Sequence, residues 1–511
     1  MADNTPIDII RSHDSNDLDF ERTSRHGQDH NAQSLTEPQP DGDEDEKDKR
    51  ALPPDGGYGW VCVACVFWIN AHTWGINSSY GVFLSYYLSH DVFPNTSVLA
   101  YAFTGGLSIS CALLIAPLST YLIHLFGNRV VVNLGVFFET LSFIGASFAS
   151  KKWQIFLSQG VCFGIGMGFL FVGSVSITPQ WFLKRRSVAM GITAAGSGLG
   201  GLIWSLAVGA MIPGIGLAWT FRVLGIVSCV VNLVCANLLR DRNKIIGSRL
   251  APFHFPLLRR PEFLFFLGWG VFSMLGYVSL LFSMADFALS IGLSSHQASV
   301  VSALLNLGQG LGRPFVGMFS DRLGRINIAT LLSFCCGFFC LIIWIFADSM
   351  GVTCFFAVLV GTVSGTYWAT VSPVLAEIIG LRDLPSGLSI AWLCLVAPCT
   401  VSEPIALELR ARLPGGGSSY QHLQIFTGFA YIGASLFLWI VRGWKVGEQE
   451  REERRREEAT QGGPLTEEVG ENEKRERPAT ILSTSTSAAT TNAQLWAPFG
   501  LVRRMVAMKR V

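Results

Sequence analysis

The sequence predicts an all-α membrane protein with twelve transmembrane helices in two six-helix halves. Of its 511 residues, 50% are hydrophobic and only 15% are charged, whereas about 25% of the residues in soluble domains are charged. Twelve apolar stretches are each close to the ~20 residues that a helix needs to cross a bilayer. A short polar segment separates the first six stretches from the last six, and this spacing predicts two halves.

The twelve stretches give the expected bounds of the membrane spans. The predicted ranges are 60–83, 97–122, 130–149, 153–178, 187–211 and 217–239, then 261–285, 296–318, 326–346, 351–379, 384–408 and 422–444. Three glycines of the first half recur at a constant offset in the second, namely Gly127, Gly164 and Gly168 as Gly324, Gly361 and Gly365. Such a repeat is typical of transporters built from two related units.

The predicted domain organisation has five segments. They are an N-terminal tail at 1–53, the first half at 54–240, a short central loop at 241–260, the second half at 261–444 and a C-terminal tail at 445–511. Both tails are rich in polar and charged residues, so they bury too little apolar surface to offset the entropy of ordering. We therefore expect the first tail to be disordered and the second to be mostly disordered.

The basic residues of the loops predict the orientation of the chain. Lysine and arginine gather in alternate loops, including the central one, and such loops face the cytoplasm. Both termini are therefore expected in the cytoplasm. We expect a multi-pass protein of the plasma membrane, with the vacuolar membrane as the alternative.

Several classes of protein are excluded by composition and motif. The net charge of +1 does not indicate a nucleic-acid partner. No phosphate-binding loop, kinase pattern, zinc-protease pattern or nucleophile elbow is present, so we expect neither an enzyme nor a cofactor. Cys62 and Cys65 have the spacing of metal ligands but lie within an apolar span. We expect them to be buried without a metal.

The stretch GMFSDRLGR, here called the second-half loop, joins spans 8 and 9. Gly317 at its start lets two helices approach closely, and Asp321 can pair with Arg322, with Arg325 or with a neighbouring helix end. The stretch resembles the loop signature G-x-x-x-D-R-x-G-R of the major facilitator superfamily. The resemblance implies the major facilitator fold. It also implies that the contacts of Asp321 form a latch, which breaks when the two halves move relative to each other.

The corresponding first-half loop joins spans 2 and 3 and reads IHLFGNR. It keeps Gly127 and Arg129 but has His124 where the signature has an acid. The first half therefore departs from the pattern at the residue that would form the latch.

The stretch PDGGYGW stands where the N-terminal tail meets the first span. Asp55 can cap the first helix, Gly56 and Gly57 let the backbone bend as it enters the membrane, and Trp60 suits the depth of the headgroups. DGGYGW also resembles a signature of the monocarboxylate porter family. A second signature of that family is matched by WFLKRRSVAMGITAAGSGLGG, between spans 4 and 5.

This resemblance covers residues 54–444 and has the character of the fungal branch. In animal members, a lysine in span 1 and an Asp-x-x-x-Arg set in span 8 handle the proton and the carboxylate. Here Ser78 stands in place of the lysine and Gln309 in place of the aspartate, so only Arg313 is retained. The coupling scheme of those members therefore does not carry over to this chain.

Arg313 is the strongest candidate for a substrate-binding residue. An arginine inside the membrane costs about 2.5–3.5 kcal/mol on insertion scales and normally faces the interior of the bundle. Asn306, Gln309 and Arg313 share one helix face and could present two amides and a guanidinium to a carboxylate. The alternative is that Arg313 braces the cytoplasmic end of the helix against the second-half loop.

Further candidates lie on spans 1, 3, 7 and 10. In the major facilitator superfamily, which this chain resembles, the helices of spans 1, 7 and 10 line the cavity. We therefore expect three of their residues to contact substrate, namely Asn77, Tyr277 and Tyr367. Glu139 and His72 are the candidates for proton coupling. For both residues a structural hydrogen bond inside the bundle is the alternative.

These residues predict a secondary active transporter of a small organic anion or carboxylate-bearing metabolite. We expect alternating access, linked to a proton, in a monomeric unit surrounded by lipid. Two alternatives stay open within transport: an efflux pump for a fungal secondary metabolite and a carrier of a vitamin-like solute. A membrane sensor without transport is a third, which the short central loop disfavours.

Overall fold

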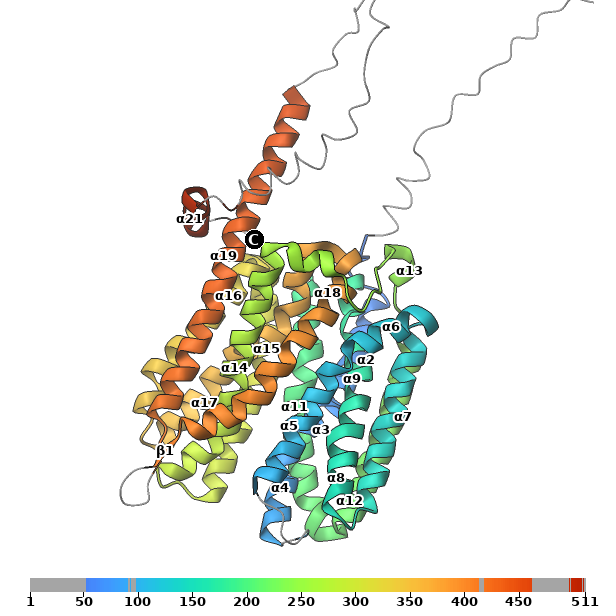
Figure 1. Ribbon diagram of the computed structural model, residues 1–511, viewed down its shortest axis with the longest axis vertical. Coiled ribbons are helices and arrows are strands. Elements are labelled where there is room, and N and C mark those ends of the chain that lie inside the picture. The colour runs from blue at the N-terminus through green and yellow to red at the C-terminus, as the bar shows by residue number, and fades with distance from the viewer. Residues whose placement is uncertain are drawn as a thin grey trace, which may run out of the picture. The chain divides into compact units, whose positions relative to one another are not determined.

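The computed structural model describes residues 52–90, 92, 98–412, 418–461, 496, 498–507 and 509. The predicted disordered tail at 1–53 lies almost entirely outside these residues. The described part of the chain is a bundle of long helices (Figure 1).

The described residues of the first half form helices. They are α2 (Gly59–His72), α3 (Trp74–Ser78), α4 (Tyr80–Ser89), α5 (Val98–Leu114), α6 (Ala116–Phe126), α7 (Asn128–Ser147), α8 (Lys152–Ile155), the π-helix η1 (Phe156–Cys162), α9 (Phe163–Val175), α10 (Thr178–Trp181), α11 (Arg186–Ile215) and α12 (Leu217–Leu238). The central loop contains α13 (Asn243–Ile246) and the 3₁₀ helix η2 (Phe255–Arg259).

The second half has the same character. Its elements are α14 (Pro261–Ser290), α15 (Ser295–Leu323), α16 (Arg325–Ile342), the 3₁₀ helix η3 (Trp344–Phe346), α17 (Met350–Ser364), α18 (Thr366–Glu408), β1 (Ala411–Arg412), β2 (Ser418–Ser419), α19 (Gln421–Gln461) and α21 (Pro498–Val506). The two-residue strands β1 and β2 pair antiparallel in the turn before α19.

The helices agree with the predicted membrane architecture. In the described residues, nine helices are long and apolar enough to cross a membrane, and the bent pair α5 and α6 raises the number to ten. Adding α15, which is more polar, and dividing α18 at the non-helical Gly380 gives the twelve predicted spans. The predicted all-α membrane fold is confirmed.

Glycines make the tight turns between consecutive spans. Gly127 ends α6 with φ +83°, Gly324 ends α15 with φ +104°, and Gly380 divides α18 with φ +80°. Side chains rarely adopt these backbone angles, whereas glycine adopts them without steric cost. The repeated pair Gly127 and Gly324 therefore marks the same turn in each half.

Helix α11 of the first half and α15 of the second lie backbone against backbone. A Cβ at Gly198 would lie 2.7 Å from the amide nitrogen of Gly310, and a Cβ at Gly317 would collide with the carbonyl oxygen of Ser187. Glycine is therefore required for this close approach, as predicted for Gly317. The two halves meet along this seam.

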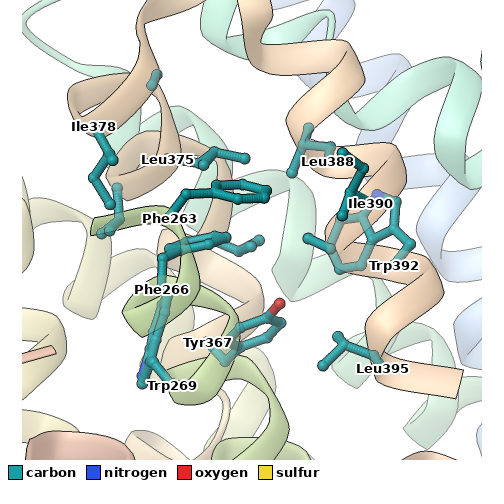
Figure 2. Packing of buried hydrophobic residues seen from close by; sticks show 14 of the residues in the cluster. Phe263, Phe266, Trp269, Tyr367, Leu375, Ile378, Leu388, Ile390, Trp392 and Leu395 are labelled. Carbon is teal, nitrogen blue, oxygen red and sulfur yellow. The ribbon is translucent and has the colours of Figure 1, made fainter. Parts of the chain in front are cut away.

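A large hydrophobic cluster lies mainly between α14 and α18 of the second half and extends to first-half residues such as Phe171 and Met190 (Figure 2). Phe263 and Phe266 of α14 point toward the part of α18 that carries Leu388 and Trp392, and Tyr367 lies between Trp269 and Leu395. Trp269 and Trp392 are fully buried. Burial of each aromatic side chain stabilises the folded state by a few kcal/mol. The cluster therefore holds α14 and α18, which carry several cavity residues, in fixed positions.

One expectation about the ends of the bundle is wrong, and one helix extends beyond a predicted boundary. Helix α19 continues to Gln461, past the tail boundary predicted at 445. Its extension is rich in Glu and Arg, which favour helix, and Arg504 of α21 donates to Glu450 on it. The first helix is not capped by Asp55, because its N-cap is Tyr58, with no side-chain cap.

Candidate transport site

A cavity of about 410 Å³ lies between the two halves. Ala285 lies near the end of α14 and Ser302 near the start of α15, so the cavity reaches toward the end of the bundle opposite the second-half loop. Apolar side chains form much of its wall. Its polar lining residues are Asn70, Asn77, Ser78, Thr193 and Ser197 from the first half and Tyr277, Asn306, Gln309 and Arg313 from the second.

Arg313 is the one charged side chain among the described residues that line the cavity. It is only 3% exposed. Its Nη1 donates to the carbonyl oxygen of Ala194 at 2.7 Å and to the hydroxyl of Ser197, both on α11. A Cβ at Gly365 would lie 2.7 Å from its Nε, so that glycine leaves room for the guanidinium. Arg313 thus belongs to the cavity and also ties α15 to the opposite half.

Gln309 and Tyr277 complete the polar cluster around Arg313. The Oε1 of Gln309 accepts from the Nη2 of Arg313 and from the hydroxyl of Tyr277, each at 2.8 Å. Because both partners donate, this oxygen must face them, and the amide Nε2 points away. That Nε2 is buried without a hydrogen-bond partner.

Within the described part of the chain, no carboxylate neutralises the charge of Arg313. No ion pair of the described residues includes Arg313. Animal members of the monocarboxylate porter family have an aspartate at the position of Gln309. Because glutamine is neutral, the cluster around Arg313 keeps a net positive charge. A buried arginine normally pairs with an acidic side chain or with backbone carbonyls. Arg313 has a carbonyl partner in Ala194, and a carboxylate in the cavity would add an anionic one.

Two other predicted residues, Asn77 and Asn306, line the same cavity, and so does Ser78. Asn77 accepts from the hydroxyl of Ser108 at 2.7 Å. Asn306 lies one helical turn before Gln309. Ser78, in the place of the family lysine, is exposed to the cavity and donates to the carbonyl oxygen of Trp74 at 2.9 Å. The structure therefore brings residues of spans 1, 7 and 8 together.

Two predicted residues, Tyr367 and His72, do not line the cavity. Tyr367 is 3% exposed and packs in the hydrophobic cluster, with its ring centroid 4.8 Å from that of Trp269. The Nδ1 of His72 lies 2.8 Å from the carbonyl oxygen of Trp68, one turn earlier on its own helix. Periodicity placed them on the right spans but could not show which face turns toward the cavity.

Glu139 lies between helices of the first half, outside the cavity. Its side chain is fully buried, and its Oε2 accepts from the Nδ2 of Asn232 on α12 at 2.6 Å. Its Oε1 is buried without a hydrogen-bond partner. A Cβ at Gly166 of α9 would lie 2.5 Å from the amide nitrogen of Glu139, so three helices meet closely here.

The second-half loop closes one end of the bundle. Asp321 accepts from the amides of Ser187 at 3.0 Å and Val188 at 2.9 Å, at the start of α11. Arg325 donates to Asp321 at 3.2 Å and to Glu377 at 2.9 Å. The carboxylate thus stabilises the amides and the positive dipole end of a helix in the opposite half. Asp321 and Arg325 are here called the latch.

The remaining loop residues take secondary positions. Arg322 is exposed to solvent. Arg325 also donates through Nη2 to the carbonyl oxygen of Leu183 at 2.5 Å. The second half therefore binds a carbonyl group of the segment between α10 and α11 and two amide groups at the start of α11.

The PDGGYGW stretch also binds the segment between α10 and α11. Asp55 accepts from the amides of Leu183 at 2.6 Å and Lys184 at 2.7 Å. The ring of Trp60 packs on that of Phe182 with centroids 4.9 Å apart. The two stretches that resemble family signatures are therefore in contact, which sequence alone gave no means of predicting.

One of the two tryptophans in the aromatic wall of the cavity, Trp74, was not predicted from the sequence. Trp74 and Trp368 line the cavity, and their ring centroids lie 5.2 Å apart. Trp74 is one helical turn before Ser78, and this spacing is the signal that could have placed it on the cavity face. Trp74 comes from the first half and Trp368 from the second, so their contact joins the halves.

Taken together, two helical halves, a cavity between them and a latch at one end define the class of membrane transporter. The pattern of the Major Facilitator Superfamily matches residues 63–399 and, in a second overlapping match, 263–506. The chain belongs to the major facilitator superfamily. This membership and the fold indicate a transporter rather than an enzyme.

Relatives of known description agree with this assignment. The probable transporter MCH2 of Saccharomyces cerevisiae is 36% identical over 402 residues, covering 78% of this chain and 85% of the relative. The agnestins efflux protein AgnL12 of Paecilomyces divaricatus is 26% identical over 371 residues, covering 72% of this chain and 83% of that protein.

A solved structure has the same fold. The proton:xylose symporter XylE, bound to 6-bromo-6-deoxy-D-glucose, superposes with a TM-score of 0.58 at 12% identity. The match covers 75% of this chain and 94% of the symporter. At this identity the likeness concerns the fold alone.

Proposed function

We propose that the protein is a secondary active transporter of an organic anion, a small or larger metabolite that carries a carboxylate. Alternating access would move the anion through the cavity between the halves, with a proton as the coupled ion. The transport unit would be a monomer in the plasma membrane. Resemblance to the monocarboxylate porter family supports the carboxylate.

The observation that carries the proposal is the unpaired charge of Arg313. Its guanidinium is buried at the cavity wall, held by Ala194, Ser197 and Gln309, and paired with no carboxylate among the described residues. A substrate carboxylate at this position would form charge-assisted hydrogen bonds, which are about twice as strong as neutral ones. The fixed orientation of the guanidinium lowers the entropy cost of binding.

The latch supports alternating access. Asp321 and Arg325 connect the second half to the start of α11, and the cavity reaches toward the opposite end of the bundle. This arrangement corresponds to a state that is closed at the latch. Exposing the site at the other face requires these contacts to separate.

Efflux of a larger metabolite is a second candidate direction of transport. The agnestins efflux protein is one of several fungal relatives that cover most of this chain. The cavity volume of about 410 Å³ falls within the ~300–1,000 Å³ of sites for drug-sized ligands. Export and import would use the same site and differ in the driving gradient.

The proposal is tested by replacing Arg313 in purified protein reconstituted into liposomes. Arg313→Gln should lower uptake of labelled benzoate, lactate and succinate to background, whichever of these wild type carries. Arg313→Lys should keep a small part of that uptake, since it retains the charge but loses the planar fork. Arg222→Gln, which removes an arginine at the start of α12, is the matched control and should transport as wild type. Wild-type affinity in Arg313→Gln would reject the anion site and leave Arg313 as a brace.

Proton coupling has a separate test at Glu139. If this buried carboxyl carries the coupled proton, Glu139→Gln should abolish accumulation driven by a pH gradient but preserve exchange of labelled for unlabelled substrate. The isosteric amide keeps the hydrogen-bonding shape beside Asn232. Unchanged accumulation would exclude Glu139 and leave His72 or uncoupled transport.

A further inference from the structure

The cavity is larger than a small acid requires. Its volume is about 410 Å³, which suits a drug-sized ligand rather than a three-carbon acid. Arg313 and Gln309 supply polar groups on one wall. Much of the remaining lining is aromatic and aliphatic, including Trp74, Phe171 and Trp368. A ligand that fills this space needs an apolar body in addition to its anionic group.

The aromatic part of the wall is rigid. Trp368 is stacked on the fully buried Trp392, with ring centroids 5.9 Å apart and planes 13° apart. Trp74 packs edge to face on Phe171 at 5.3 Å. Tyr277, which bonds Gln309, meets Trp368 edge to face at 6.3 Å. Because the indole of Trp368 is supported on one face, its orientation toward the cavity is set before a ligand arrives.

Three buried donors of the cavity lining lack acceptors among the residues that the structure describes, and one of them is the Nε of Arg313. The Nε1 of Trp74 and the Nε2 of Gln309 are buried without a hydrogen-bond partner. Gln309 is 2% exposed, and its oxygen is already occupied by Arg313 and Tyr277. Buried donors are normally paired, so oxygen atoms of a ligand would satisfy groups that the protein leaves open.

We infer that the cargo is an organic acid with a flat aromatic body: the carboxylate binds Arg313 and the Nε2 of Gln309, and the ring packs against the wall formed by the contacting indoles of Trp74 and Trp368. This inference rests on the proposed anion transport and names its substrate class. Since Trp74 belongs to the first half and Trp368 to the second, the ring of the cargo touches both halves. Occupancy is thereby coupled to their relative movement.

The test compares three probes of similar size on purified protein in lipid nanodiscs. They are 3-phenylpropanoate, 3-cyclohexylpropanoate, which replaces the flat ring by a puckered one, and 3-phenylpropan-1-ol, which lacks the carboxylate. Wild type should bind the aromatic acid about three- to tenfold more tightly than the cyclohexyl acid, as expected for aromatic stacking beyond burial. The alcohol should bind at least tenfold more weakly than the aromatic acid.

Variants separate the ring from the charge. Trp368→Leu and Trp74→Leu should each bring the ratio between the two acids close to one, while Trp368→Phe should keep part of it. Trp219→Leu, at an exposed tryptophan of α12, is the matched control and should leave the ratio unchanged. Having two positions and a conservative variant keeps the test decisive if one leucine variant fails to fold.

The outcomes distinguish this inference from the proposed function. Equal affinity of wild type for the two acids, with both lost in Arg313→Gln, would overturn the aromatic cargo and support the anion site. Equal affinity for the aromatic acid and its alcohol, unchanged in Arg313→Gln, would reject the anion site itself. A ratio lost in both leucine variants and kept in Trp219→Leu supports the inference.

Discussion

The first-half and second-half loops share a turn but differ in what they hold. Gly127 and Gly324 both reverse the chain with a positive φ. In the second half, Arg325 pairs with Asp321 and Glu377. In the first half, the guanidinium of Arg129 donates instead to the Oδ1 of Asn237, at 3.0 and 2.6 Å. Both loops therefore have the same backbone turn, but only the second-half loop carries an acid.

The first-half loop lacks the acid that would hold the start of a helix in the opposite half, and contacts of the central loop take over this role. Asp321 holds the start of α11, whereas His124 is exposed. The start of the second part of α18, after Gly380, is held by the central loop. The hydroxyl of Ser386 donates to the carbonyl oxygen of Arg249 at 2.7 Å and accepts from the amide of Ala251 at 3.1 Å.

Backbone and charge contacts reinforce this second attachment. The amide of Arg249 donates to the carbonyl oxygen of Arg382 at 2.7 Å, and its guanidinium lies 3.4 Å from Asp383. The comparison shows two ways of closing one end of a bundle. One is an ionic latch in a tight turn, and the other is a set of mostly neutral hydrogen bonds from the segment that joins the halves.

Of the variants that test these two attachments, Asp321→Asn should have the largest effect on the rate of amide exchange. The side chain is buried, and losing its charge weakens contacts to two amides and to Arg325. Breaking a buried charge pair costs about 3 kcal/mol or more. We expect exchange at the amides of Ser187 and Val188 to accelerate by about 100-fold, measured by hydrogen–deuterium exchange in nanodiscs.

The control for this variant is Asp348→Asn, at an exposed aspartate before α17. It should leave exchange of the α11 amides unchanged. Exchange as slow in Asp321→Asn as in wild type would mean that the glycine seam, and not the latch, keeps this end closed.

Ser386→Ala should have an intermediate effect at the other attachment. The hydroxyl is fully buried and makes two neutral hydrogen bonds. Leaving such partners unpaired costs about 1–3 kcal/mol, so the amide of Ala251 should exchange about tenfold faster. Ser228→Ala removes a buried hydroxyl that bonds only within its own helix, and it should not alter this amide. Slow exchange at Ala251 in Ser386→Ala would show that the central loop is held by other contacts.

His124→Asp should have the smallest effect. It restores the acid of the signature at an exposed position, where solvent screens a new charge and ion pairs contribute about 0–1 kcal/mol. Exchange of the amides at 381–386 should change by less than about threefold. A tenfold slowing would mean that the first-half loop can still form a latch and lacks only the acid.

Much of the architecture was predictable because hydropathy and turn chemistry are local properties. Apolar stretches of bilayer length determined the spans, and glycines at the turns determined where several helices end. The cost of burying a guanidinium singled out Arg313 on span 8. Gly317 was predicted as a point of close approach, and the structure has it against Ser187.

Tertiary structure alone decided which residues meet. Asp55 holds Leu183 and Lys184 instead of its own helix, and Tyr367 enters the hydrophobic cluster instead of the cavity. The face that each helix turns toward the cavity depends on how all the helices pack. Since membrane helices are apolar on most sides, their sequence periodicity carries little information about that face, and contacts between distant segments follow only from the assembled bundle.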